Sequence, residues 1–511
     1  MLVKTYGSAV YGIDAQTITV EVNIGKGVNF CLVGLADSAV KESQQRIDAA
    51  LKNNGFKIPV KGITINMAPA NIKKEGSAYD LTIAMGILSA TEQINSPNIN
   101  EYIIMGELAL DGNLRPIRGA LPIAVQAKKE GFKGFILPID NSREAAVVDG
   151  LDVYGIKNIK EIIDFFNGTE KLTPVEVDLL ESFNEDTELF NVDFADVKGQ
   201  ETVKRGLEIA AAGGHNVIMI GPPGVGKTML AKRIPTILPP LTLTEALETT
   251  KIHSVSGLLG KTTALITKRP FRHPHHTVSD VALVGGGSNP KPGEISLAHN
   301  GILFLDELPE FKRTVLEVMR QPLEDRYVTI SRAMITVDFP ASFMLVASMN
   351  PSPSGDFYDA STSTDSEQSV RRYLNKVSGP LMDRIDLHLE VSSVPYEELR
   401  KREDGENSKT IRDRVIAARK IQNQRYEGIE GIFSNAQLEP KQMKIWCLVD
   451  DMGEQLLKNA VERLGFSARS YNRILKVART IADLEESKTI QAQHIAEAIQ
   501  FRALDRDGWL G

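Results

Sequence analysis

The chain has little cysteine and no long apolar run. The first feature argues against a disulfide-bonded protein, and the second argues against a membrane-spanning one. Its 511 residues include only two cysteines, Cys31 and Cys447, which lie far apart, each within an apolar run. Two buried free thiols are therefore favoured over a disulfide, as in a reducing compartment. No stretch approaches the roughly 18 apolar residues of a membrane span, and the N-terminus has no signal-type apolar segment. These features predict a cytoplasmic protein without membrane contact.

An excess of positive charge is also absent. The formal net charge is -7, which argues against a protein coated in nucleic acid but leaves room for a local basic channel. The hydrophobic content of 42% over this length predicts roughly two to four folded domains.

The patterning divides the chain into four segments. Residues 1–168 alternate short β-type runs with helical stretches, which predicts a compact α/β domain. The acidic segment 169–190 lacks periodicity and is interpreted as a linker. Residues 191–395 alternate buried-type strands with helices, as in a parallel sheet covered on both faces. Residues 396–511 are strongly helical.

Two insertions are predicted within residues 191–395. One covers residues 271–292 and is rich in His, Gly and Pro, and the other is a hairpin in RYVTISRAMITVDFP. Basic and imidazole side chains of these segments are candidates to line a channel for nucleic acid. They would grip phosphates without reading bases, although packing is an open alternative for each. These residues are Lys268, Arg269, Arg272, His273, His275, His276, Arg326 and Arg332. A metal at the three histidines is the less favoured interpretation.

A phosphate-binding loop is the most specific motif in the sequence. GPPGVGKT follows the apolar strand NVIMI and precedes the helix-compatible MLAKRI, the context that a P-loop requires. Its glycines let backbone N–H groups face phosphates, Lys227 offers a charge to the β and γ oxygens, and Thr228 offers a hydroxyl to Mg²⁺. The motif predicts an ATP and Mg²⁺ site at Gly221, Pro222, Pro223, Gly224, Val225, Gly226, Lys227 and Thr228.

Two further strands end in polar residues suited to ATP hydrolysis. GILFLDE places Asp306 where it can hold Mg²⁺ and Glu307 where it can polarise the attacking water. FMLVASMN delivers Asn350, whose amide can orient that water, although a turn-forming Asn before proline is an alternative.

These motifs resemble the AAA+ superfamily, and the resemblance supplies two arginines. Arg384, in GPLMDRIDLHLEV, matches the arginine finger that reaches the γ-phosphate of a neighbouring subunit. Arg469, in FSARSYNRIL, matches the sensor arginine at the start of a lid helix, and surface ion pairing is the alternative for both. A finger acting in trans implies a homo-oligomer. Val197, Gly199 and Gln200 lie in a segment that resembles the one that clasps adenine.

The whole chain resembles the YifB/ComM family of magnesium-chelatase-like AAA+ proteins. The similarity rests on KKEGSAYDLTIAMGIL, GELALDGNLRPIRGALP, RPFRHPHHTVSDVALVGGG and GEISLAHNGILFLDELPEF. It implies a Lon-protease-like domain at 1–168, an AAA+ core at 191–395 and a helical lid, like the magnesium-chelatase C-terminal domain, at 396–511.

The function implied by this resemblance is a ring-forming, hexameric ATP-dependent DNA helicase. It would drive branch migration during recombination or transformation, on single-stranded or branched DNA without sequence preference, with recombination proteins as possible partners. Two alternatives stay open: a magnesium-chelatase-type motor subunit, and a Lon-like or protein-remodelling machine.

The sequence departs from the family at two places. Where relatives carry Cys-Pro-Cys-Gly and Cys-x-Cys, this chain has Ser352, Ser354, Ser361 and Ser363, which cannot replace thiolates on zinc. A mobile Ser/Thr-rich loop at 352–369 without structural zinc is expected. The catalytic serine and lysine positions of Lon-type peptidases fall on Ala78 and Leu121, so the domain is expected to lack peptidase activity unless Ser77 serves. Lys73 and Lys74 are weak candidates for DNA contact.

Overall fold

The computed structural model divides the chain into two compact units. It describes residues 2–178, 190–287, 289–332, 335–355, 365–400, 405–429, 431–464 and 466–502. One unit comprises Met1–Asp186 with Thr242–Thr267, and the other comprises Thr187–Leu241 with Lys268–Gly511.

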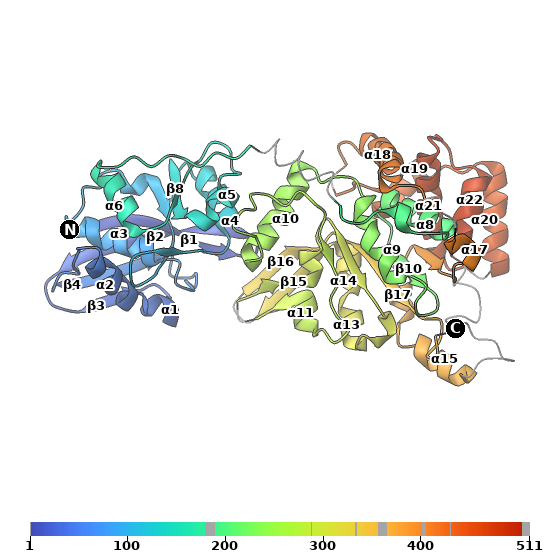
Figure 1. Ribbon diagram of the computed structural model, residues 1–511, viewed down its shortest axis with the longest axis horizontal. Helices are drawn as coiled ribbons and strands as arrows, with labels where there is room; N and C mark the ends of the chain where they lie inside the picture. The colour runs from blue at the N-terminus through green and yellow to red at the C-terminus, as the bar shows by residue number, and fades with distance from the viewer. Residues whose placement is uncertain are drawn as a thin grey trace. The chain divides into compact units, whose positions relative to one another are not determined.

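The N-terminal unit is built on a seven-stranded mixed sheet in the order β3-β4-β2-β1-β5-β8-β9 (Figure 1). Its strands are β1 (Leu2–Tyr11), β2 (Asp14–Gly25), β3 (Phe30–Val33), β4 (Gly62–Ala68), β5 (Tyr102–Ile104), β8 (Gly134–Pro138) and β9 (Asp152–Ile156). Its longer helices are α2 (Ser43–Asn53), α3 (Asp80–Ala90), α4 (Ala120–Lys129) and α6 (Ile159–Asn167). This is the α/β domain that the alternating pattern predicts.

The N-terminal unit also takes in a helix from the middle of the chain. Helix α10 (Leu243–Ser256) begins at a capping box formed by Thr242 and Glu245 and packs with α4. The Gly119 N–H, at the start of α4, donates to the Ser254 carbonyl oxygen at 3.2 Å. Sequence patterning follows chain order, so it assigned this helix to the segment 191–395.

The expectation of two buried thiols is wrong for one of them. Cys447 is buried, but Cys31 is exposed. Strand β3 carries Cys31 and lies at the edge of the sheet, where it pairs only with β4. Its residues alternate between half-buried and exposed, so an apolar sequence on an edge strand keeps one face open.

The second unit contains the predicted parallel sheet. Five parallel strands lie in the order β11-β14-β17-β10-β18. They are β10 (Val217–Ile220), β11 (Phe271–Arg272), β14 (Ile302–Leu305), β17 (Met344–Met349) and β18 (Leu387–Glu390). The residues of β10, β14 and β17 are all buried, as expected for a parallel sheet covered on both faces.

Helices cover this sheet and form the predicted C-terminal helical region. Figure 1 shows that region gathered beside α8 (Glu201–Gly213), in orange to red. Its longer helices are α18 (Ser408–Arg425), α19 (Pro440–Trp446), α20 (Asp451–Leu464), α21 (Ala468–Leu484) and α22 (Ala492–Gln500). Both α18 and α21 pack against α8, so this region shares one hydrophobic core with the sheet.

The second predicted insertion is confirmed as a hairpin of β15 (Tyr327–Arg332) and β16 (Ile335–Pro340). The first contains β11, a short helix α11 (Asp280–Val284) and a two-residue pairing of β12 (Gly285–Gly286) with β13 (Lys291–Pro292). Among the described residues, no helix combines the length and apolar character needed to cross a bilayer.

Helix α10 gives a test of the N-terminal unit. Ile252 is fully buried, so Ile252→Ala is expected to destabilise this unit by about 3 kcal/mol through lost burial and a cavity. Hydrogen exchange of the α4 amides should then be faster. Leu258→Ala is the matched control, because Leu258 is 53% exposed in the same segment. Equal exchange in both variants would contradict the assignment of α10 to this unit.

Candidate active site

The P-loop connects β10 to α9 (Lys227–Arg233), the strand, loop and helix arrangement that the sequence predicts. Gly224 and Gly226 have φ angles of 82° and 93°, in the left-handed region that favours glycine. At Gly221, a Cβ atom would lie 2.1 Å from the carbonyl oxygen of Val391. These glycines therefore permit the backbone path by which such a loop presents its N–H groups to phosphates.

Lys227 is buried at the base of the loop. Its Nζ donates to the carbonyl oxygens of Gly221 (2.6 Å) and Pro222 (2.8 Å) and to Oδ1 of Asn350 (2.9 Å). Burial lowers the pKa of Lys227, while nearby carboxylates act in the opposite direction. The predicted water-orienting amide of Asn350 therefore lies beside the predicted phosphate-binding lysine. A charged phosphate oxygen is a stronger hydrogen-bond acceptor for Lys227 than a neutral carbonyl oxygen.

Asp306 follows β14, and its carboxylate lies between two hydroxyl groups. Its Oδ2 accepts a hydrogen bond from Thr228 Oγ1 at 2.7 Å, and its Oδ1 accepts one from Ser348 Oγ. The strand register explains this arrangement, because Leu305 lies opposite Ala347 and the next residues are therefore neighbours. Sequence reasoning missed Ser348, although it is the one polar residue of the apolar strand β17.

The donor set of Thr228 and Asp306 fits Mg²⁺. A hydroxyl and a carboxylate are oxygen ligands, and this cation completes its shell with water and nucleotide phosphates. Bound there, Mg²⁺ would neutralise charge on the β and γ phosphates. In the part of the chain that the structure describes, no three or more His, Cys, Asp or Glu side chains are placed to hold a metal. The two residues therefore suit a cation that arrives with its nucleotide.

Glu307 adopts a left-handed backbone conformation, with a φ angle of 56°. Its N–H lies 3.1 Å from Oδ1 of Asp306 and 3.4 Å from Oγ of Ser348. Its side chain is 59% exposed, and its Oε2 lies 3.5 Å from Nδ1 of His276. The predicted catalytic carboxylate thus lies next to Asp306, a predicted Mg²⁺ ligand, and faces the first insertion.

The segment that resembles an adenine clasp lies beside the P-loop. Gly199 and Gln200 have φ angles of 60° and 61°, just before α8. The Gln200 side-chain amide donates to the carbonyl oxygen of Ser392, the residue after the Val391 that approaches Gly221. The segment around Gly199 and Gln200 therefore lies near the start of the P-loop.

The two predicted arginines lie at the opposite edge of the sheet. Strand β18 runs parallel to β10, with Leu387 opposite Val217. The P-loop follows the carboxyl end of β10, whereas Arg384 precedes the amino end of β18. Asn216, which precedes β10, donates its side-chain amide to the Arg384 carbonyl oxygen at 3.0 Å. Arg384 and the P-loop of its own chain therefore lie at opposite ends of the strands of this sheet.

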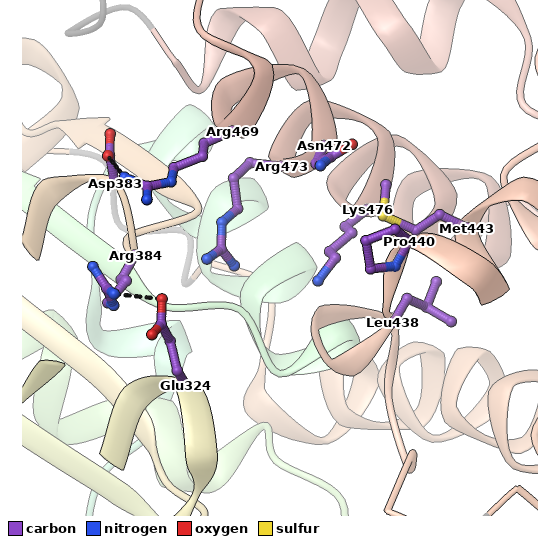
Figure 2. A pocket seen from close by; sticks show the side chains of 10 residues that line it. All are labelled: Glu324, Asp383, Arg384, Leu438, Pro440, Met443, Arg469, Asn472, Arg473 and Lys476. Carbon is purple, nitrogen blue, oxygen red and sulfur yellow. Dashed lines mark hydrogen bonds and ion pairs between the residues drawn. The ribbon is translucent and has the colours of Figure 1, made fainter. Parts of the chain in front are cut away.

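Arg384 and Arg469 line one cavity of about 320 Å³ (Figure 2). Arg384 pairs with Glu324, and Arg469 pairs with Asp383 across 2.7 Å. Two more cations extend from α21 into the same space, Arg473 and Lys476. None of the eight P-loop residues lines this cavity. The predicted site residues thus form two groups, one at each edge of the sheet.

Four of the basic residues predicted to line a channel have partners within the second unit. Lys268 lies over the ring of Phe190, 5.7 Å from its centroid. Arg272 forms a two-point ion pair with Glu294, at 2.6 and 2.8 Å. Arg269 donates to main-chain carbonyl oxygens at 2.6 and 2.7 Å. Burial lowers the pKa of Arg326 to about 10, and this side chain donates to the Gly431 carbonyl. The exposed members of the predicted set are His273, His275 and Arg332.

The comparison with known proteins matches the chain along its full length. Residues 193–399 match a family model described as magnesium chelatase, subunit ChlI, and residues 405–502 match the C-terminal model of that subunit. Residues 20–141 match a model described as subunit ChlI of Mg-chelatase. Competence protein ComM of Haemophilus influenzae is 44% identical over 509 residues, 99% of this chain and 98% of that protein. The chain belongs to the ComM/YifB family.

Two other relatives support the division of the chain into a Lon-related segment and a magnesium-chelatase-type core. Protein YifB of Escherichia coli K12 is 44% identical over 501 residues, 98% of this chain and 96% of that protein. Lon protease 2 of Bacillus subtilis is 31% identical over 128 residues, 25% of this chain and 23% of that protein. The chain therefore combines a magnesium-chelatase-type AAA+ ATPase core with a Lon-related segment.

Ser77 and Leu121, at or beside the predicted Lon-type catalytic positions, have well-defined surroundings in the N-terminal unit. Ser77 donates a hydrogen bond to the Glu107 carboxylate, which also lies 3.4 Å from Arg115. Leu121 is fully buried. A serine nucleophile needs a base that removes its proton, and among its described contacts Ser77 has a carboxylate and no lysine.

The two lysines proposed as weak DNA contacts both have partners in the N-terminal unit, but Lys74 is buried whereas Lys73 is exposed. Lys74 is fully buried and donates to the carbonyl oxygen of Gly34 at 2.9 Å, and burial lowers its pKa. Lys73 pairs with Glu75. Lys74 is thus unsuited to contact DNA, because its ammonium does not reach the surface.

The structure describes both ends of the serine-rich segment. Ser352 is fully buried, and its hydroxyl lies 3.0 Å from that of Ser354. Ser366 caps helix α15 (Glu367–Leu374), so the predicted loop ends before residue 369 and is wrong at that end. Ser361 and Ser363 lie outside the described residues, as does the rest of 356–364.

Ser348 gives a test of this site. Ser348→Ala removes one hydrogen bond from Asp306, so turnover is expected to fall about 10-fold and to require more Mg²⁺. A Mg²⁺ titration of the ATPase rate measures both changes. Ser342→Ala is the matched control, because Ser342 contacts its neighbours through backbone atoms just before the same strand. An unaltered Mg²⁺ dependence would contradict the role of Ser348.

Proposed function

We propose that this chain is a ring-forming, ATP-driven DNA motor that acts as a helicase in branch migration during recombination or transformation. The observation that carries the proposal is the division of the site between the two edges of one parallel sheet. The competence role named for the Haemophilus influenzae relative and the family resemblance support the choice of DNA as substrate.

The divided site calls for a second copy of the chain. The carboxyl edge holds Lys227, Thr228 and Asp306, and the amino edge holds Arg384 with Arg469. Arginines stabilise the charge that develops on the transferred γ-phosphate, and one supplied by a neighbour makes hydrolysis depend on assembly. In a closed ring, each amino edge would face the P-loop of the next subunit.

Within each P-loop site, the contacts support a role for each residue. Lys227 would bind the β and γ oxygens in exchange for its carbonyl partners, and Thr228 and Asp306 would hold a magnesium ion. Glu307 takes the proton of the attacking water as a general base, and Asn350 orients that water. The contact between Asn350 and Lys227 sets the water-orienting amide beside the phosphate-binding lysine.

The two alternatives have less support. A Lon-like proteolytic machine activates its serine with a lysine, whereas the Ser77 hydroxyl donates to the Glu107 carboxylate and has no lysine among its described contacts. A magnesium-chelatase motor subunit shares the core models, but the Lon-related segment and the match over 99% of the chain to ComM favour the DNA motor.

A mixing experiment tests the shared site. Arg384→Ala is expected to keep ATP binding and lose most hydrolysis, and Lys227→Ala is expected to lose ATP binding. When the two inactive variants are mixed, about a quarter of the interfaces join an intact P-loop to an intact Arg384 and regain turnover. Mixing Arg384→Ala with Asp306→Ala should also restore activity. A mixture without any turnover, in rings shown to contain both variants, would contradict action in trans.

A second experiment tests DNA as the substrate. The ATPase rate of the intact protein is measured with single-stranded, duplex and four-way-junction DNA and without DNA. We expect stimulation by DNA that weakens as salt increases, because phosphate contacts release counterions. Glu307→Gln, which should bind ATP without hydrolysing it, gives the background. Active turnover that no DNA changes would remove the helicase proposal and favour the alternatives.

A further inference from the structure

Two neighbouring loops of the N-terminal unit carry its most exposed apolar residues. Residues 26–29 join β2 to β3, and residues 54–61 join α2 to β4; together they are called the loop pair. Val60 is 86% exposed and Val28 is 73% exposed, the highest fractions among the large apolar residues that the structure describes. A single exposed valine is ordinary, but one on each of two adjoining loops indicates a binding surface.

The two loops meet at the start of β4. The N–H of Ile63 donates to the carbonyl oxygen of Asn29 at 2.8 Å. A Cβ atom on Gly62 would lie 2.7 Å from the carbonyl oxygen of Lys26. The turn after β2 therefore passes close to the first residues of β4, which brings the backbone of Lys26 near that of Lys61.

The second loop is anchored at its base. The Gln93 side chain accepts a hydrogen bond from the Lys57 N–H at 3.2 Å and donates one to the Lys57 carbonyl oxygen at 2.9 Å. Phe56 and Ile58 pack against the hydrophobic core of the unit. The exposed side chains of this loop thus project from a backbone that is already fixed, so that binding a ligand costs little ordering.

The loop pair is positively charged. Lys26, Lys57 and Lys61 are exposed, and none of the three forms an ion pair with any residue that the structure describes. Residues 22–36 and 49–74 contain one and five lysines, respectively, and no aspartate or glutamate, in a chain whose net charge is -7. This surface therefore attracts a polyanion.

We propose that the loop pair is a sequence-independent DNA contact. Lys26, Lys57 and Lys61 bind phosphates, and Val28 and Val60 contact the sugars and base edges beside them. The inference rests on the proposed function for DNA as the substrate. Lysines hold a phosphate backbone without reading bases, and short apolar side chains pack against the grooves or against unstacked bases. The N-terminal unit thereby acts by gripping DNA, without peptidase chemistry.

A protein partner fits the loop pair less well. The centres of protein interfaces are enriched in aromatic residues, Met and Arg, and they are depleted of Lys. The loop pair contains no Arg, Met, Tyr or Trp, and its one aromatic residue, Phe56, is half-buried against the core. Its combination of lysine and valine suits contact with a nucleic-acid backbone better.

The test measures binding of the full-length chain to labelled single-stranded, duplex and four-way-junction DNA over a range of salt concentrations. The triple variant Lys26→Gln, Lys57→Gln and Lys61→Gln is expected to bind each DNA about 10-fold more weakly at about 0.1 M salt. The slope of log affinity against log salt should become shallower by about two to three, because each lost phosphate contact removes about 0.7–0.9 from it.

A second variant tests the apolar contact. Val28→Ser with Val60→Ser is expected to weaken binding about three-fold through the loss of buried apolar surface. The salt slope should stay as in the intact protein, because no charge is removed. Unchanged affinity in this variant would overturn the role of the two valines.

The matched control is the triple variant Lys128→Gln, Lys129→Gln and Lys160→Gln. These lysines are exposed on α4 and α6 of the same unit, and their replacement removes the same charge. The control should keep nearly the affinity and salt slope of the intact protein. ATP turnover without DNA should be unaltered in all of these variants.

The outcomes separate this inference from the proposed function. If the intact protein binds DNA and the two lysine variants have equal affinity and salt slope, the contact at the loop pair is overturned while the proposed function stands. An intact protein that binds none of the three DNAs would remove both. If the loop variant loses as much affinity for poly-L-glutamate as for DNA, the loop pair is assigned to an acidic protein instead.

Discussion

The parallel register of β10, β14 and β17 is the constraint on which the rest of the site depends. Parallel strands end at the same edge of a sheet, so loops that are about 80 and 120 residues apart in the chain meet there. Leu305 opposite Ala347 brings Asp306 to Ser348, and β10 beside both strands brings the P-loop to them. Every residue of these three strands is buried, so side chains on both faces of the sheet pack against the elements that cover it.

The same register also places Arg384 away from the P-loop of its own chain. Strand β18 extends the sheet beyond β10, and the residues before it emerge at the amino edge. Arg384 is held there by Glu324, and Arg469 reaches the same cavity from α21. Their partners are carboxylates that a more highly charged phosphate can outcompete. These arginines and the P-loop therefore lie at opposite ends of neighbouring parallel strands.

Much of the site was predictable because its residues follow local patterns. GPPGVGKT between a strand and a helix, and the apolar strands that end in Asp306 and Asn350, carry their own structural context. Ser348 escaped prediction, because its contact with Asp306 depends on the strand opposite. His276 was predicted to line a channel, but its contact with Glu307 was not foreseen. Hydrophobic periodicity does not reveal which residues of distant segments will contact each other in the folded chain.

By itself, the sequence determined the α/β class, the parallel sheet with its P-loop, the hairpin and the helical C-terminal region. Hydrophobic periodicity and loop chemistry are local properties, and they specify such elements directly. Only the tertiary structure decided that α10 joins the N-terminal unit, that Cys31 is exposed on an edge strand, and that Arg272 and Arg326 have partners inside the second unit. Those outcomes depend on which segments, distant in the sequence, pack against each other. Local sequence patterns do not specify these long-range contacts.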